Sequence, residues 1–103
     1  MSELSDMLSF QLKALGIPHL REMRLIPGRK FRTDIFIQPH LAIECDGATW
    51  TGGRHTRGQG VEDDCEKQCL LASLGYRPMR VTKRQIKLGL AAAWIQAAMK
   101  AVL

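Results

Sequence analysis

Three carboxylates of this chain have the types and spacing that could bind a divalent cation. Asp34 lies in the apolar run "FRTDIFI", and Glu44 and Asp46 end the next apolar run, "LAIECDG". Carboxylates are poor strand formers and are costly beside a core, so their presence in two neighbouring strands needs a physical reason. Because hard carboxylate oxygens suit Mg²⁺ or Mn²⁺, a metal site would supply that reason.

The pairing of the two strands decides whether these side chains meet. Side chains alternate along a strand, so Glu44 and Asp46 share one face. If "QPH" is a hairpin loop of three residues, Ile37 pairs with Leu41 and Asp34 lies opposite Glu44, about 5 Å away. Without a cation, one of these acids should then have a raised pKa.

A second interpretation of the acids requires no metal. They could be edge-strand carboxylates that face solvent or pair with Arg32. A register slip of one residue would favour this interpretation, because it would put Asp34 and Glu44 on opposite faces of the sheet. Glu22, on an earlier strand, is expected to be a solvated strand acid, with a supporting role in the site as the alternative.

The elements that must position these acids follow from the hydrophobic pattern and the turn residues. We predict a mixed sheet of about four strands flanked by helices, in the order αβββαβα, because the strand patterns are interrupted by helical periodicity. The tail helix should be interrupted near Gly89. The predicted helices span residues 3–15, 61–75 and 83–102, and the predicted strands span residues 21–26, 31–37, 41–45 and 77–82.

Length and composition limit the class of protein. The 103 residues, 46% of them hydrophobic, suit one domain, residues 1–103, with one core. No apolar run approaches the roughly 18–20 residues of a membrane span, and the acids near the start do not suit an export signal. Cys65 and Cys69 could bind zinc with His55, but zinc needs about four such ligands. We therefore expect buried thiols in a cytoplasmic protein.

Positive charge is concentrated in the second half of the chain. The net charge is +5, and residues 52–103 hold nine basic against four acidic residues. A basic surface suits a polyanion, although it also serves solubility alone. The glycine-rich segment "TGGRHTRGQG" carries Arg54, His55 and Arg57, which could contact phosphates or lie on a solvated loop. A second basic group could extend that track or form a plain solvated face: Lys83, Arg84 and Lys87.

Taken together, these segments resemble the PD-(D/E)XK nuclease superfamily. The pattern is an acid on one strand, "IECD" on the next, a helix containing "DCEK", and "LGYRPMRVT". It is most similar to small members akin to very-short-patch-repair endonucleases and Holliday-junction resolvases, including a prophage- and bacteria-encoded group. The similarity runs from about Glu3 to Gly89, and it implies a restriction-endonuclease-like fold.

The resemblance also implies roles for individual residues. Asp34 and Glu44 match metal-binding acids, and Glu3 matches a first-helix acid that supports metal binding. Asp46 stands where the superfamily usually has lysine, so it would be a further ligand or a base that positions water. Lys67 is then the candidate for the missing positive charge. Apart from the resemblance, His55 could be a general base, and Trp50 is expected to be a packing residue, with a base-stacking wedge as the alternative.

The function that this resemblance implies is a Mg²⁺- or Mn²⁺-dependent DNA endonuclease. A structure-selective enzyme of junction-resolving or repair type, of phage or prophage origin, is favoured over a sequence-specific one. Two other classes stay open, which are a non-catalytic nucleic-acid-binding module that kept the fold and a small structural protein. If the substrate is a junction, a homodimer is expected, and the apolar tail is either its interface or part of the protein's own core.

Overall fold

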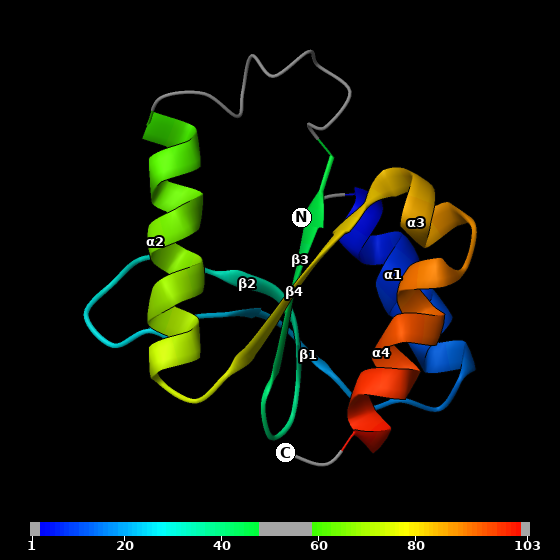
Figure 1. The fold of residues 1–103 in the computed structure, drawn as a ribbon. Coiled ribbons are helices and arrows are strands. Elements are labelled where there is room, and N and C mark those ends of the chain that lie inside the picture. The colour runs from blue at the N-terminus through cyan, green and yellow to red at the C-terminus, as the bar shows by residue number, and fades with distance from the viewer. Residues whose placement is uncertain (1–2, 48–58, 102–103) are drawn as a thin grey trace.

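The computed structural model describes residues 3–47 and 59–101, which form a four-stranded sheet with helices on both faces. Helix α2 covers one face, and α1, α3 and α4 cover the other (Figure 1). The helices are α1 (Glu3–Ala14), α2 (Gln59–Ser73), α3 (Lys83–Lys87) and α4 (Leu90–Lys100). The strands are β1 (Leu20–Met23), β2 (Thr33–Ile37), β3 (Leu41–Asp46) and β4 (Arg77–Thr82).

The sheet is mixed, as the sequence predicts. Its strand order is β1-β2-β3-β4, with antiparallel pairing of β1 with β2 and of β2 with β3. Strands β3 and β4 are parallel, and α2 is the crossover between them. The carboxyl ends of β3 and β4 therefore lie side by side, with Asp46 paired to Thr82. This arrangement confirms the predicted order of elements.

The main core lies between the sheet and α1, α3 and α4. Leu8 and Leu12 of α1 are fully buried against Ile35 and Ile43 of the sheet. The opposite face has a smaller apolar cluster, in which Leu71 of α2 packs with two further buried residues: Ile26 and Ala42. The sheet is thus packed mainly through one of its two faces.

Several predicted boundaries differ from the structure, and two of the differences change the surroundings of an apolar side chain. Strand β1 is shorter than residues 21–26, because Glu22 has a positive φ of 55° and the chain beyond Met23 leaves the sheet. Ile26 then joins the cluster beneath α2. Leu15 was expected on the apolar face of the first helix, but α1 ends at Ala14 and Leu15 is exposed.

The tail helix is divided as predicted. Gly89, with φ 79°, separates α3 from α4, a backbone conformation that favours glycine. Ala91 and Ile95 face the core, whereas Trp94 is exposed. The tail therefore packs on its own sheet and leaves part of its apolar surface uncovered. Among the described residues, no helix has the length and apolar character needed to cross a membrane.

Candidate functional site

The predicted pairing of the two acidic strands is correct. Ile37 pairs with Leu41 and Ile35 with Ile43, and the same register places Asp34 opposite Glu44. Both side chains lie on the face that α2 covers, since the alternate residues of these strands enter the core on the other face. The backbone amide of Cys45 donates a hydrogen bond to Asp34 Oδ2 at 2.8 Å. This hydrogen bond ties the first acid directly to the second strand.

The pKa values of the Asp34 and Glu44 carboxyl groups are both raised above their ordinary values. Burial raises the pKa of Asp34, and the nearby charge of Glu22 raises it further, against the opposing effect of the Cys45 amide. Burial also raises the pKa of Glu44, although its contact with Lys67 lowers it in part. A raised pKa in a cross-strand carboxylate pair is what crowding and desolvation predict.

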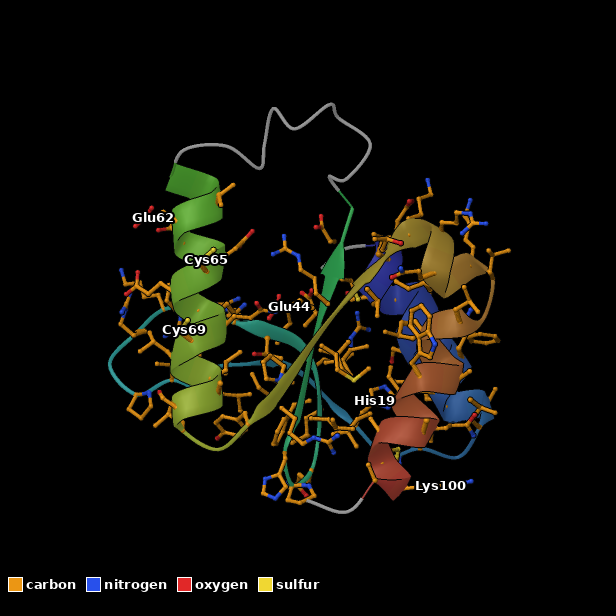
Figure 2. All side chains as sticks on the ribbon, in the orientation of Figure 1. His19, Glu44, Glu62, Cys65, Cys69 and Lys100 are labelled. Carbon is orange, nitrogen blue, oxygen red and sulfur yellow. The ribbon has the colours of Figure 1, made fainter. Side chains whose placement is uncertain are left out.

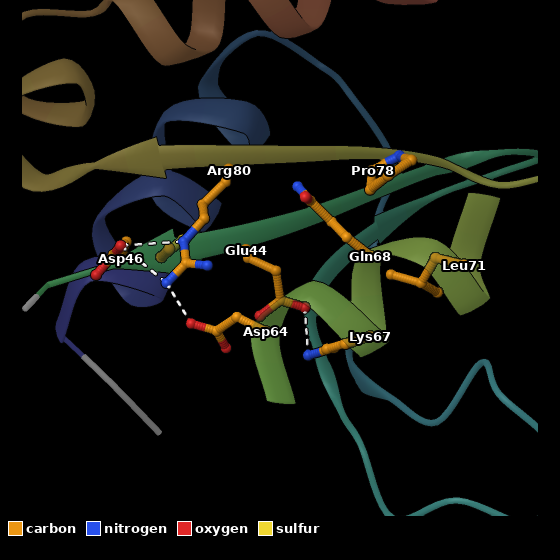
Figure 3. A pocket seen from close by; sticks show the side chains of 9 residues that line it. Glu44, Asp46, Asp64, Lys67, Gln68, Leu71, Pro78 and Arg80 are labelled. Carbon is orange, nitrogen blue, oxygen red and sulfur yellow. Dashed lines mark hydrogen bonds and ion pairs between the residues drawn. The ribbon is translucent and has the colours of Figure 1, made fainter. Parts of the chain in front are cut away.

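Lys67 reaches this pair from α2. Its Nζ lies 2.6 Å from Glu44 Oε2, and the Lys67 side chain is only 14% exposed. The same ammonium donates to the backbone carbonyl oxygen of Arg32. The family resemblance singles out Lys67 as the candidate for the missing positive charge, and the structure places it beside Glu44 (Figure 3). The catalytic role of Lys67 remains a prediction.

A second group of charges lies beside the first. Arg80 of β4 is directly beside Glu44 in the parallel register. Its guanidinium contacts Asp46 Oδ2 at 3.0 Å and Asp64 Oδ2 at 2.8 Å. Glu44 and Lys67 of the first group, together with Asp46, Asp64 and Arg80, line one cavity of about 220 Å³ between the sheet and α2, whereas Asp34 does not line it. Its lining is largely polar: Glu44, Cys45, Asp46, Asp64, Lys67, Gln68, Leu71, Pro78 and Arg80.

The acids fit a Mg²⁺ or Mn²⁺ ion that takes few protein ligands. Among residues 3–47 and 59–101, no three His, Cys, Asp or Glu side chains are grouped closely enough to form a metal site by themselves. Mg²⁺ is commonly bound through one or two carboxylates, with water and substrate phosphates completing its coordination. Glu44 Oε2 is buried and accepts no well-directed hydrogen bond from the described residues, although Lys67 is close to it. Asp34 and Glu44 therefore suit this mode of binding.

Glu3 and two lysines lie in a separate pocket. This pocket, of about 440 Å³, is lined by Glu3, Lys83 and Lys87 together with Cys45 and Gly47. It adjoins the carboxyl end of β3, but its lining includes α1 and α3 of the opposite layer. Glu3 and Lys83 are thus near the same end of the sheet as the acids. Arg84 is exposed on α3 and does not line this pocket.

Several other predicted residues do not join the described site. Arg54, His55, Arg57 and Trp50 lie outside the described residues. The expectation of buried thiols is wrong for Cys65 and Cys69, which are free and exposed on α2 (Figure 2). They occupy the side of the helix turned away from the sheet.

Glu22 is neither fully solvated nor in direct contact with Glu44. Its side chain is 32% exposed, and its Oε1 lies 3.9 Å from Arg32 Nη1. Its charge contributes to the raised pKa of Asp34. Arg32, with which the alternative interpretation pairs the three acids, forms an ion pair with Glu22.

Arg80 is the residue that sequence reasoning missed. Alternation along "RPMRVT" places Pro78, Arg80 and Thr82 on one face of β4. That signal could have identified an inward-facing arginine. The parallel register that sets Arg80 beside Glu44 was not available from the sequence, because α2 separates the two strands.

Comparison with known proteins identifies a solved structure with a similar fold. No protein-family model and no curated protein matches the sequence. Among solved structures, the chain is similar to the catalytic domain of the homing endonuclease I-Bth0305I, with a TM-score of 0.72 and 18% identity. The match covers 93% of this chain and 92% of that one. The mixed, four-stranded, nuclease-like fold predicted from the sequence is therefore confirmed.

Proposed function

We propose that this chain is a divalent-metal-dependent DNA endonuclease, an enzyme that hydrolyses phosphodiester bonds, with its site between the sheet and α2. The observation that carries the proposal is the placement of Asp34 opposite Glu44, with Lys67 2.6 Å from the second acid. Two desolvated carboxylates and a nearly buried cation would be a costly arrangement for stability alone. The nuclease-like fold supports the same assignment.

The chemistry accounts for each residue type. Cleavage of a phosphodiester requires an activated water and stabilisation of an anionic transition state. Asp34 and Glu44 would hold Mg²⁺ or Mn²⁺, which when bound acidifies a water and neutralises developing charge. The hydrogen bond from Cys45 fixes Asp34, and Lys67 fixes Glu44. The ammonium of Lys67 also places positive charge beside the reacting groups, in a site that is partly shielded from solvent.

The DNA would approach along the carboxyl ends of β3 and β4. The glycine-rich segment with Arg54, His55 and Arg57 follows β3, and Lys83 and Arg84 follow β4. Phosphate contacts from these residues would position the duplex without reading its sequence. The resemblance to small PD-(D/E)XK nucleases further suggests a structure-selective enzyme of junction-resolving or repair type and of phage or prophage origin. We propose that it acts in the cytoplasm. A junction substrate would require two sites and hence a homodimer.

Cleavage assays test the proposal directly. Labelled duplex, nicked, flapped and four-way DNA would be incubated with Mg²⁺, with Mn²⁺ and with EDTA. We expect cleavage of at least one branched substrate in either metal and none in EDTA. Binding without cleavage in both metals would instead make the chain a nucleic-acid-binding module that kept the fold. Absence of binding at low salt would remove nucleic acid as the partner.

A further inference from the structure

Arg80 is a second cation in the candidate site, and none of the roles assigned above involves it. It lies beside Glu44 across the parallel pair of strands and lines the same cavity as Lys67. The two cations differ in exposure, because the Arg80 side chain is 37% exposed and the Lys67 side chain is 14% exposed. Lys67 is therefore engaged inside the site, whereas Arg80 faces the space that a ligand could enter.

Two carboxylates from different elements orient the Arg80 guanidinium. Nε and Nη2 both lie 3.0 Å from Asp46 Oδ2 on β3, and Nη2 lies 2.8 Å from Asp64 Oδ2 on α2 (Figure 3). Among the described residues, no hydrogen bond uses Nη1. The planar group is thus held through Nε and Nη2, and within residues 3–47 and 59–101 none of these contacts engages Nη1. Preorganised donors of this kind are effective where negative charge develops in a reaction.

We propose that Arg80 contacts the phosphate that is cleaved, and that Asp46 and Asp64 are positioning residues that aim its guanidinium. This inference rests on the proposed nuclease function. Nε and Nη2 are engaged by the two carboxylates, so the contact with a phosphate oxygen would come from the N–H groups of Nη1. The assignment also gives Asp46 a role other than metal ligand, since its carboxylate faces Arg80. The competing interpretation is an ion-pair cross-link that fastens β4 to α2.

The test compares Arg80→Met with Arg29→Met. Arg29 is a matched control, because its Nη1 forms a 2.6 Å ion pair with Glu66 of α2 and it does not line the cavity. DNA binding would be measured in EDTA as a function of salt, and single-turnover cleavage would be measured at saturating enzyme. We expect Arg80→Met to reduce the slope of log K against log salt by about one unit. We expect its cleavage rate to fall by about 10². Arg29→Met should change neither quantity.

Further variants keep the test decisive if Arg80→Met does not fold. Arg80→Lys retains the charge and loses the guanidinium that Asp46 and Asp64 orient. Its salt slope should therefore be normal, and its cleavage rate should lie between those of the wild type and Arg80→Met. Asp64→Asn should lower the rate with no change in salt slope. A normal rate for Arg80→Lys together with a normal rate for Asp64→Asn would overturn the inference.

The same experiment separates failure of this inference from failure of the proposed function. If the wild type cleaves DNA and folded Arg80→Met cleaves equally well with an unchanged salt slope, Arg80 is a structural cross-link and the nuclease assignment stands. If the wild type cleaves none of the substrates, the nuclease assignment fails. The salt slope then still decides whether Arg80 contacts a phosphate.

Discussion

The two faces of the sheet are built from alternate residues of the same strands, yet their chemistry is opposite. On the face toward α1, α3 and α4, Ile35, Ile43 and Val81 are almost completely buried in one apolar cluster. On the face toward α2, the intervening positions include Glu44 and Arg80. The contrast indicates that the first face supplies most of the stability, whereas the second face carries the proposed site.

The polar face is a poor source of stability. Its ion pairs join α2 to the sheet through Lys67 and Arg80. The partly exposed pair of Arg80 and Asp64 contributes on the order of 0–1 kcal/mol. Desolvation offsets the attraction in the more buried pair of Lys67 and Glu44. The apolar contribution beneath α2 comes mainly from Leu71 and its few neighbours. Substitutions on the two faces should therefore have different consequences, and the following predictions test that difference.

The largest effect on stability is expected on the apolar face. Ile43→Ala removes a fully buried side chain from the centre of the main cluster and should cost about 2–5 kcal/mol of unfolding free energy. Urea denaturation would measure the loss. A folded fraction of this variant, kept below its unfolding temperature, should cleave DNA at the normal rate. A loss under about 1 kcal/mol would show that the core is not concentrated on this face.

Lys67→Met keeps the apolar stem and removes the charge. In contrast to Ile43→Ala, it is expected to lower the cleavage rate rather than the stability. We predict that the cleavage rate falls by about 10² with metal affinity nearly unchanged, the usual scale for one preorganised charged or proton-transfer group. Lys100→Met, at the exposed end of α4, is the control. Cleavage by Lys67→Met at the normal rate would make this cation dispensable.

A smaller effect is expected in the glycine-rich segment that follows β3. Replacing Arg54 and Arg57 with Ala should weaken binding to all DNA sequences and flatten the salt dependence by about one unit per lost phosphate contact. Titration of labelled DNA at several salt concentrations would measure the slope. An unchanged slope would assign both arginines to a solvated loop.

The smallest effect is expected from the titration of Asp34. Burial raises its pKa, so the folded state binds a proton more tightly than the unfolded state does. Stability should therefore fall as the pH rises from about 4 through the raised pKa. Asp34→Asn removes this contribution, and its stability relative to wild type should rise over the same window. Thermal unfolding without metal at several pH values would detect it, and parallel curves for the two proteins would contradict it.

Much of this architecture could be predicted from the sequence because it depends on local signals. The hairpin between β2 and β3 is short, so the alternation of apolar residues and the loop length together fix the register of Asp34 and Glu44. The proximity of Lys67 to Glu44 agrees with the family resemblance rather than with a local sequence signal. In these elements, sequence periodicity and tertiary packing favour the same arrangement.

What could not be predicted depends on contacts between distant segments. The pairing of Arg80 with Asp46 and Asp64 requires the register of two strands joined by a helical crossover. The exit of the chain from β1 depends on the positive φ of Glu22 and on burial of Ile26 beneath α2. Hydrophobic pattern alone does not encode either arrangement.

The most direct test compares the same substitution at Glu44 of β3, inside the cavity, and at Glu66 of α2, outside it. Glu44 and Glu66 each form a 2.6 Å ion pair that involves this helix, but only Glu44 lines the cavity. Single-turnover cleavage in Mg²⁺ would be measured for Glu44→Gln and Glu66→Gln, alongside DNA binding in EDTA. The account predicts that Glu44→Gln loses cleavage by a factor of about 10² to 10⁴ and still binds DNA, whereas Glu66→Gln cleaves normally. Equal cleavage by the two variants would contradict the placement of the active site on this face of the sheet.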